Sequence, residues 1–378
     1  MMRSRGVIGQ LAHRYGQLGL FALLLALLPI LVRSPYWIST MIFVGLYTIL
    51  TVGLCLLVGY AGQISLGTNA FFGLGAYASA IITTRLGLSP WLGILISMAL
   101  TGILGAGLAK PVFRLKGQFL ALATLGLGVI FYIMFNEAST LTGGPSGIAG
   151  VPYLAIGSHR QLGIVFDQDI ETYYLVWGAA TVTLLISLNL VNSRLGRALR
   201  AIHDSEIATQ TLGADTARLK TQIFVIGCVY AGLAGSLYAH YVTFVSPSPF
   251  GLHMSLMLLV MAAIGGMGTV WGAPFGAAVV TLLTEFLRSV VPKLSNHASG
   301  EYEIIVFGVL LIVIMRWMPE GVVQKLSRFF RRRLKARPAA TPASGTSPLL
   351  APVPGDGKLT QWRLGQENTD VGSDGGRF

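Results

Sequence analysis

The feature that most constrains this chain is a succession of apolar segments, each long enough to cross a lipid bilayer. A membrane-spanning helix needs about 20 mainly apolar residues. Such segments cover residues 18–32, 36–59, 66–83, 90–109, 117–136, 172–192, 221–243, 253–271, 273–290 and 301–318. Only 11% of the residues are charged, against roughly 25% in soluble domains. The sequence therefore predicts an all-α polytopic membrane protein with about ten transmembrane helices.

Lysine and arginine are unevenly distributed between these segments. With the N-terminus inside, 19 of those up to Arg337 fall on the cytoplasmic side and five on the other side. Basic loops tend to remain in the cytoplasm. This predicts that both termini are cytoplasmic, with a cytoplasmic loop at 193–220 and an extracytoplasmic loop at 137–171. The same distribution explains the net charge of +12, so nucleic-acid binding is not indicated.

The loop at 193–220 carries a helix signal among its basic residues. Asp204 or Ser205 can cap the N-terminus of a short helix, and Glu206 is favourable near its positive end. Gly213 suits the left-handed position that follows a helix. We expect a short, capped helix from Ser205 to Gly213 that a soluble partner can bind.

Two glycine-rich stretches, 59–77 and 265–276, are poor candidates for uninterrupted helices, so some spans are expected to be discontinuous. Non-helical backbone at membrane depth is tolerated where protein buries it or where it lines a watery cavity. Transporters place such breaks near the substrate path, whereas glycines also allow close helix packing. We favour packing for the second stretch and a path for the first. Only the first combines glycines with clustered polar side chains, at Gln63, Ser65, Thr68 and Asn69.

The chain contains little that could drive active transport by itself. The spans hold almost no carboxylates or histidines, which mark proton and cation pathways. Glu285 and Arg288 near the end of the ninth span are interpreted as an interfacial ion pair. A phosphate-binding loop needs Gly-x-x-x-x-Gly-Lys-Ser/Thr, and the one Gly-Lys pair, Gly357-Lys358, is followed by leucine. If the chain supports active transport, we expect another subunit to supply the energy.

Enzymatic and metal-binding alternatives are weaker. Ser236 and His240 lie four residues apart on one helix, an arrangement that suggests an intramembrane hydrolase, but no nucleophile-turn motif surrounds them. The acidic residues of 167–171 suit a solvated loop better than a cation site. Cys55 and Cys228 lie in apolar runs and are interpreted as small buried side chains. We therefore expect no catalytic residues, no metal site and no cofactor in this chain.

The two ends of the chain differ from the remainder. The apolar run after Arg14 lacks a small-residue cleavage site and is interpreted as a retained first span. From Arg331 the chain opens with basic residues and then becomes rich in Pro, Ala, Gly and Ser. Such a composition cannot bury enough apolar surface to fold. We expect a transmembrane permease domain over 1–330 and a disordered cytoplasmic tail over 331–378.

Taken in order, the motifs resemble those of permease subunits of branched-chain amino-acid ATP-binding-cassette (ABC) importers, of the LivM type. The resemblance covers about residues 36–325. It is carried by Gly62-Gln63-x-Ser65-Leu66-Gly67, Thr142-Gly143-Gly144-Pro145-x-Gly147, Gly196-Arg197-Ala198 and Gly265-Gly266-x-Gly268. The chain departs from the family pattern at His203, Thr209 and Thr68.

The resemblance implies a type II importer-like fold in the bacterial plasma (inner) membrane. It implies a second homologous permease subunit, two ABC ATPase subunits that hold ATP-Mg, an extracytoplasmic substrate-binding protein and a surround of membrane lipid. The substrate would be a branched-chain or related amino acid. The residues assigned to ATPase coupling would be Arg197, Arg200, Asp204, Glu206 and Gly213, and the path would include Gln63, Ser65, Thr68 and Asn69. The main alternative is an ion-coupled secondary transporter of small neutral or zwitterionic solutes.

Overall fold

The protein is mainly helical. The computed structural model describes residues 16, 18–29, 34–115, 117–156, 164–165, 169–294 and 309. Its longer helices are Leu18–Pro29, α2 (Pro35–Cys55), α3 (Thr68–Thr84), α4 (Pro90–Val112), α5 (Gln118–Glu137), α7 (Asp169–Asn192), α8 (Arg194–Asp204), α10 (Thr216–Val242), α11 (Leu252–Gly265) and α12 (Gly272–Leu294). Shorter elements are α6 (Ser139–Thr142), α9 (Glu206–Thr211), a π-helical turn (Leu56–Tyr60) and two 3-10 turns (Gly144–Ser146 and Ser248–Phe250).

Five helical segments in the described part of the chain are long and apolar enough to cross a bilayer. They are Pro35–Tyr60, α4, α5, α7 and α10. The chain divides into one unit over 1–332 and a second over 333–378. The predicted tenth span at 301–318, apart from residue 309, and the predicted disordered tail lie outside the described residues.

The eighth predicted span is shorter than the sequence indicated: predicted over 253–271, it ends as a helix at Gly265. Of the first predicted span, 18–32, the structure describes Leu18–Pro29, which is helical throughout. The eighth prediction was wrong at its C-terminal end because the backbone turns out of the helix at Gly266, where φ is +95°. At 14 residues, α11 is about 21 Å long, which is less than the bilayer core of about 30 Å.

The loops contain short strands that an all-α prediction omitted. β1 (Ile148–Ala149) pairs antiparallel with β4 (Phe244–Val245), and β2 (Ala155–Ile156) pairs with β3 (Ile164–Val165). Two-residue strands leave no periodic pattern in a sequence. They provide partners for loop backbone groups that the helices cannot satisfy.

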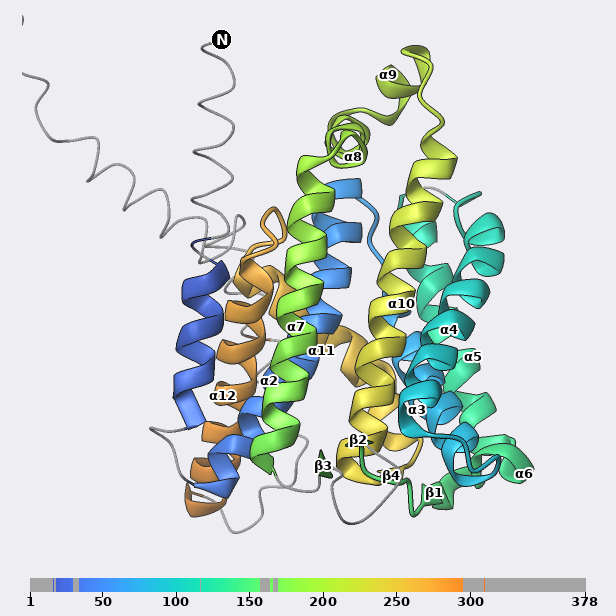
Figure 1. The fold of residues 1–378 in the computed structure, drawn as a ribbon. Helices are drawn as coiled ribbons and strands as arrows, with labels where there is room; N and C mark the ends of the chain where they lie inside the picture. Colours follow the sequence, from blue (N-terminus) through green and yellow to red (C-terminus); the bar gives the residue numbers. More distant parts are fainter. Residues whose placement is uncertain are drawn as a thin grey trace, which may run out of the picture. The chain divides into compact units, whose positions relative to one another are not determined.

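The helices have two distinct ends in Figure 1. α8 and α9 lie at one end, together with the connection between α4 and α5. The strands β1 to β4 lie at the other end, where α2 and α7 begin and α10 ends. The end of α4, whose last turn includes Lys110, and the connection to α5, which includes Arg114, therefore lie at the same end as α8 and α9.

The centre of the helix packing is a close contact among α3, α4 and α10. A Cβ atom at Gly75 would lie 2.6 Å from the Gly232 Cα atom, and one at Gly232 would lie 2.2 Å from Thr101 Oγ1. Ser97 Oγ donates to the carbonyl oxygens of Gly75, at 2.9 Å, and Gly232, at 3.3 Å. Small residues thus bring three helix backbones together, the usual means of helix association in membranes.

The second glycine-rich stretch also serves packing, as we favoured. A Cβ atom at Gly265 would lie 2.0 Å from the Gly272 carbonyl oxygen, and one at Gly276 would lie 1.9 Å from that of Met261. These glycines let the backbones of α11 and α12 approach each other directly around the turn between them.

We predict that Gly75→Val destabilises the protein by about 1–3 kcal/mol, because the added side chain has no space against α10. The matched control is Gly107→Val on α4, where nothing lies within 4 Å of an added Cβ atom. Melting of the detergent-solubilised protein checks this prediction. Equal melting temperatures for the two variants would contradict it.

Candidate functional site

The basic segment between α7 and α10 folds into two short helices, α8 and α9. The Ser193 hydroxyl accepts a hydrogen bond from Leu195 N–H at 3.2 Å and caps α8. α8 buries Gly196, Leu199 and Ile202 on one face, so it packs against the rest of the protein. The opposite face carries the charged residues.

The two arginines predicted to contact an ATPase also hold the α7–α8 turn. Arg197 Nη1 donates to the carbonyl oxygen of Asn192 at 3.2 Å, and Arg200 Nη2 donates to that of Val191 at 2.9 Å. These carbonyls belong to the last turn of α7, where helix geometry leaves them without partners and a cation is favourable. Both side chains remain exposed, so each is accessible to a partner as well.

α9 is capped at both ends much as the sequence predicts. Of the two candidate caps it is Ser205 that accepts from Ala208 N–H, at 3.3 Å, whereas Asp204 is the last residue of α8. Gly213 follows the helix with φ +84° and donates its N–H to Gln210 O at 2.9 Å. At six residues, the helix is slightly shorter than the expected Ser205 to Gly213.

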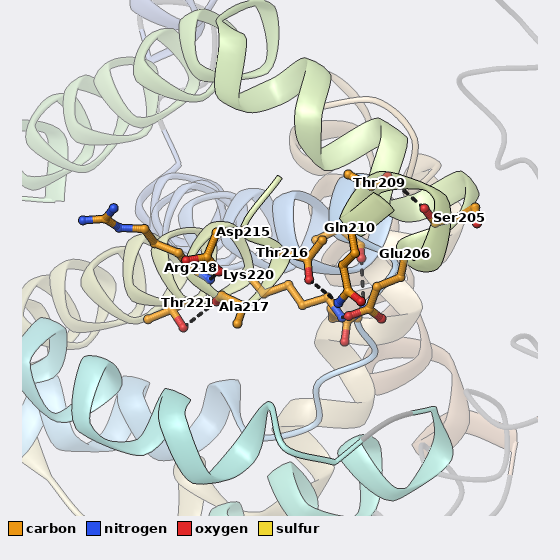
Figure 2. Close-up of polar contacts among 12 residues, drawn as sticks. Ser205, Glu206, Thr209, Gln210, Asp215, Thr216, Ala217, Arg218, Lys220 and Thr221 are labelled. Carbon is orange, nitrogen blue, oxygen red and sulfur yellow. Dashed lines mark hydrogen bonds and ion pairs between the residues drawn. The ribbon is translucent and has the colours of Figure 1, made fainter. Parts of the chain in front are cut away.

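An ion pair fixes α9 to α10. Lys220 Nζ lies 2.7 Å from Glu206 Oε1, and the two side chains are 6% and 29% exposed, respectively. Figure 2 shows this pair beside the hydrogen bond from Gln210 Nε2 to Thr216 Oγ1, which is 2.7 Å long. Glu206 therefore has a structural role inside the chain, and a charge reversal there would disturb the fold as well as any partner contact.

Two apolar side chains on this element were not recognised from the sequence. Ile207 is 76% exposed and Leu212 is 86% exposed, one on α9 and the other directly after it. The sequence signal that could have identified them is the presence of isolated apolar residues within a polar, basic loop. They give the tip of the element an apolar surface that a protein partner can bury.

The first glycine-rich stretch is a true interruption between two helices. α2 continues into the π-helical turn Leu56–Tyr60, residues 62–67 are non-helical, and α3 begins only at Thr68. A Cβ atom at Gly59 would lie 1.7 Å from the Met267 carbonyl oxygen, so the interruption packs on the turn between α11 and α12. The two glycine-rich stretches thus contact each other.

The interruption also touches α8. Gly62 has φ +65°, and a Cβ atom added to it would lie 3.0 Å from His203 Nδ1. His203 is one of the positions at which the chain departs from the family pattern. The element that carries α9 is therefore in direct contact with the break in the α2–α3 helix.

The structure brings together two of the four predicted path residues. Ser65 and Thr68 line a small cavity between α2, α3 and α10 with a volume of about 20 Å³, room for about one water molecule. Gln63 lies half-buried and donates its amide to Ala61 O at 3.1 Å. In this conformation the backbone around these residues is closed to an amino acid.

Asn69 has a different environment from the other three. It is 1% exposed, and its Nδ2 donates to Phe250 O at 2.9 Å while its Oδ1 accepts from Ser255 Oγ at 2.8 Å. These bonds join the start of α3 to the start of α11. Thr124 Oγ1 on α5 supports the same region by accepting from Leu66 N–H at 3.0 Å.

The hydrolase and metal alternatives receive no geometric support. Ser236 Oγ donates to Leu233 O at 2.9 Å, whereas His240 Nε2 bonds to Ser79 Oγ at 2.9 Å and its Nδ1 bonds to Pro152 O at 2.7 Å. The histidine thus links α10 to α3 and to the 151–154 loop. No cluster of three His, Cys, Asp or Glu side chains suited to a metal ion occurs in the described ranges.

We predict an asymmetry between the two partners of the Glu206–Lys220 pair. Glu206→Gln leaves a buried ammonium group without its counter-ion, whereas Lys220→Met leaves a carboxylate that water can reach, so the first variant should lose more stability. Because the residues interact, the double variant should melt higher than additivity predicts. Thermal melting of all four proteins tests this. The prediction would be contradicted if the two single changes lowered the melting temperature equally, or if the effect of the double variant equalled the sum of the two single effects.

Comparison with known proteins identifies the family of this chain. Residues 36–315 match the family described as branched-chain amino acid transport system / permease component. LivM, a high-affinity branched-chain amino acid transport system permease protein of Salmonella typhimurium, is 31% identical over 326 residues, which cover 79% of this chain and 74% of the relative.

Other relatives are also permease proteins of branched-chain amino acid transport systems. LivM of Escherichia coli (strain K12) is 31% identical over 328 residues, 79% of this chain and 74% of its own. LivH of Salmonella typhimurium is 25% identical over 293 residues, 73% of this chain and 91% of its own. No solved structure matches the chain significantly. The chain is a membrane transport component that belongs to the branched-chain amino acid transport permease family.

Proposed function

We propose that this chain is the membrane-spanning permease subunit of an ATP-driven importer of branched-chain or related amino acids. The observation that carries the proposal is the contact between two parts of the chain. α8 and α9 present an exposed surface at one end of the helices, and His203 at the end of α8 lies against Gly62 in the helix break. Movement of the α8–α9 element is thereby transmitted to the interruption.

The proposed assembly contains a second homologous permease subunit, two ABC ATPase subunits that hold ATP-Mg, and an extracytoplasmic substrate-binding protein. The lack of a phosphate-binding loop in the sequence supports a separate ATPase. The exposed side chains of Ile207 and Leu212 supply an apolar contact for it, and Arg197, Arg200 and Asp204 lie on the preceding helix, α8. LivM and LivH are named as permease proteins of transport systems, which supports further subunits.

The proposed topology is a type II importer-like fold with ten spans in the bacterial inner membrane. Both termini and the α8–α9 element would face the cytoplasm, and residues 137–171 would lie outside. Support comes from the end of α4 and its connection to α5, which lie at the same end as the basic α8–α9 element and carry Lys110 and Arg114, as expected for a cytoplasmic surface.

We propose that the substrate passes the helix break. Ser65 and Thr68, which line the small cavity, and Gln63 would border the path when the break opens. Asn69 would act by holding α3 to the start of α11 while these elements move. The small volume of the cavity fits a closed state of such a path.

Ion coupling has less support. Apart from tyrosines and cysteines, the buried ionisable side chains in the described part of the chain are Lys220 and His240, one near each end of α10. Lys220 is paired with Glu206 and His240 is hydrogen-bonded on both ring nitrogens. Uptake that requires ATP and persists with an uncoupler would separate the two mechanisms.

We predict that Ile207→Asp or Leu212→Asp lowers ATP-dependent uptake of leucine at least about tenfold, because loss of an apolar contact worth about 1.4 kcal/mol weakens binding by that factor. Proteoliposomes that contain the complete assembly provide the measurement. Leu86→Asp is the control, since Leu86 is also exposed, at 65%, but follows α3 at the opposite end. Normal uptake in both α9 variants would refute the coupling assignment.

A further inference from the structure

A second, much larger cavity lies between α2, α11 and α12. Its volume is about 530 Å³, within the range of small-molecule binding sites. The walls come from the N-terminal half of α2, the start of α11 and the C-terminal half of α12. These parts lie away from α8 and α9 in Figure 1, so in the proposed topology the cavity faces the outside.

The cavity has one carboxylate and one guanidinium group in its wall. Glu285 and Arg288 are one helical turn apart on α12, and both line the cavity. Tyr36 donates its hydroxyl to Glu285 Oε1, but a carboxylate has about four acceptor positions, so others remain. A guanidinium group has five N–H donors, so it can bind a carboxylate while it also interacts with another partner.

The rest of the wall is mixed. Its apolar side chains include Phe43 of α2 and Met254 and Met257 of α11, and its polar ones include Ser39, Tyr47, Ser248 and His253. Methionine side chains adapt to apolar groups of different shape. The cavity thus places a pair of opposite charges and apolar side chains around one space that is open to the surface.

One hydroxyl in the wall lacks the partner that its neighbours have. Thr40 Oγ1 donates to Tyr36 O at 2.9 Å, and Thr284 Oγ1 donates to Val280 O at 2.9 Å, each within its own helix. Thr281 is 7% exposed, yet its Oγ1 has no hydrogen-bond partner within the described ranges. Buried hydroxyls are normally satisfied, so the wall contains a side chain with unused hydrogen-bonding capacity. The oxygen itself is covered in this conformation, and a rotation about χ1 of Thr281 would turn it toward the cavity.

We propose that this cavity binds a free, zwitterionic α-amino acid with an apolar side chain. Glu285 accepts from the ammonium group, Arg288 binds the carboxylate, Thr281 contributes a hydrogen bond, and Phe43, Met254 and Met257 surround the side chain. The cavity would receive the amino acid at the outer face before it reaches the helix break. This inference rests on the proposed function, because that function supplies the class of ligand.

The test measures binding of radiolabelled L-leucine to the purified full chain in lipid nanodiscs. Glu285→Gln and Arg288→Gln should each weaken binding at least about tenfold, the effect of losing a charged hydrogen bond, and Thr281→Val about fivefold. Arg85→Gln and Glu137→Gln are matched controls, since both residues are exposed and neither lines the cavity. They should leave binding unchanged.

Competition on the unmodified chain keeps the proposal testable if a variant fails to fold. Leucinamide lacks the carboxylate, 4-methylpentanoate lacks the ammonium group and glycine lacks the apolar side chain. Each should compete at least about tenfold less well than L-leucine. Equal competition by all of them, or no leucine binding at 10 mM, which is roughly ten times a weak millimolar Kd, would overturn the proposal.

A phosphatidylethanolamine headgroup also combines an ammonium group with an anion. Binding is therefore compared in nanodiscs of phosphatidylcholine alone and with added phosphatidylethanolamine. Equal leucine binding in both supports a free amino acid, and binding abolished by phosphatidylethanolamine assigns the cavity to lipid and overturns the proposal.

Uptake by the complete assembly separates this inference from the proposed function. Normal ATP-dependent leucine uptake and unchanged binding in the Glu285 and Arg288 variants would refute the cavity assignment and leave the function intact. An unmodified assembly that takes up no branched-chain amino acid would instead refute the function.

Discussion

The structure depends on the need to satisfy every backbone polar group within the membrane. Helices do this internally, so a chain that breaks its helices must bury the break in protein. Here the break between α2 and α3 packs against the turn between α11 and α12, with Gly59 directly on the Met267 carbonyl. The contacts of Gly75, Gly232 and Ser97 hold α3, α4 and α10 closely around it. Close backbone packing thus makes an interrupted helix compatible with a bilayer.

The same packing connects the break to the surface. α8 lies between the exposed α9 and the interruption, with Arg197 and Arg200 on the end of α7 and His203 against Gly62. The Glu206–Lys220 pair joins α9 to α10, and α10 packs on α3 in turn. A force applied to α9 therefore reaches both helices that border the break through short, well-packed contacts.

The sequence predicted the helical class, most helix positions, the break before α3, and the Ser205 and Gly213 caps, because periodicity, glycine and capping residues are local signals. It also predicted an interruption in 265–276, and α11 does end at Gly265. The eighth span was nevertheless drawn too far, to residue 271, because the point at which the helix stops depends on close glycine contacts with a partner helix. The partners of Asn69 and Glu206 lie 181 and 14 positions away along the chain, respectively, and such pairings leave no local pattern. Interpreting Glu285 and Arg288 as a simple ion pair likewise missed the cavity that they line.

The central claim is that α9 receives energy from a separate ATPase subunit. Cys55 and Cys228 are buried, so a cysteine introduced by Ile207→Cys is the accessible thiol among the described residues and can carry a photo-activated cross-linker. Mass spectrometry of the illuminated, intact assembly identifies what α9 touches. We predict cross-links to the nucleotide-binding subunit, with a yield that changes when ATP is added. Cross-links confined to the permease subunits, whatever the nucleotide, would contradict the account.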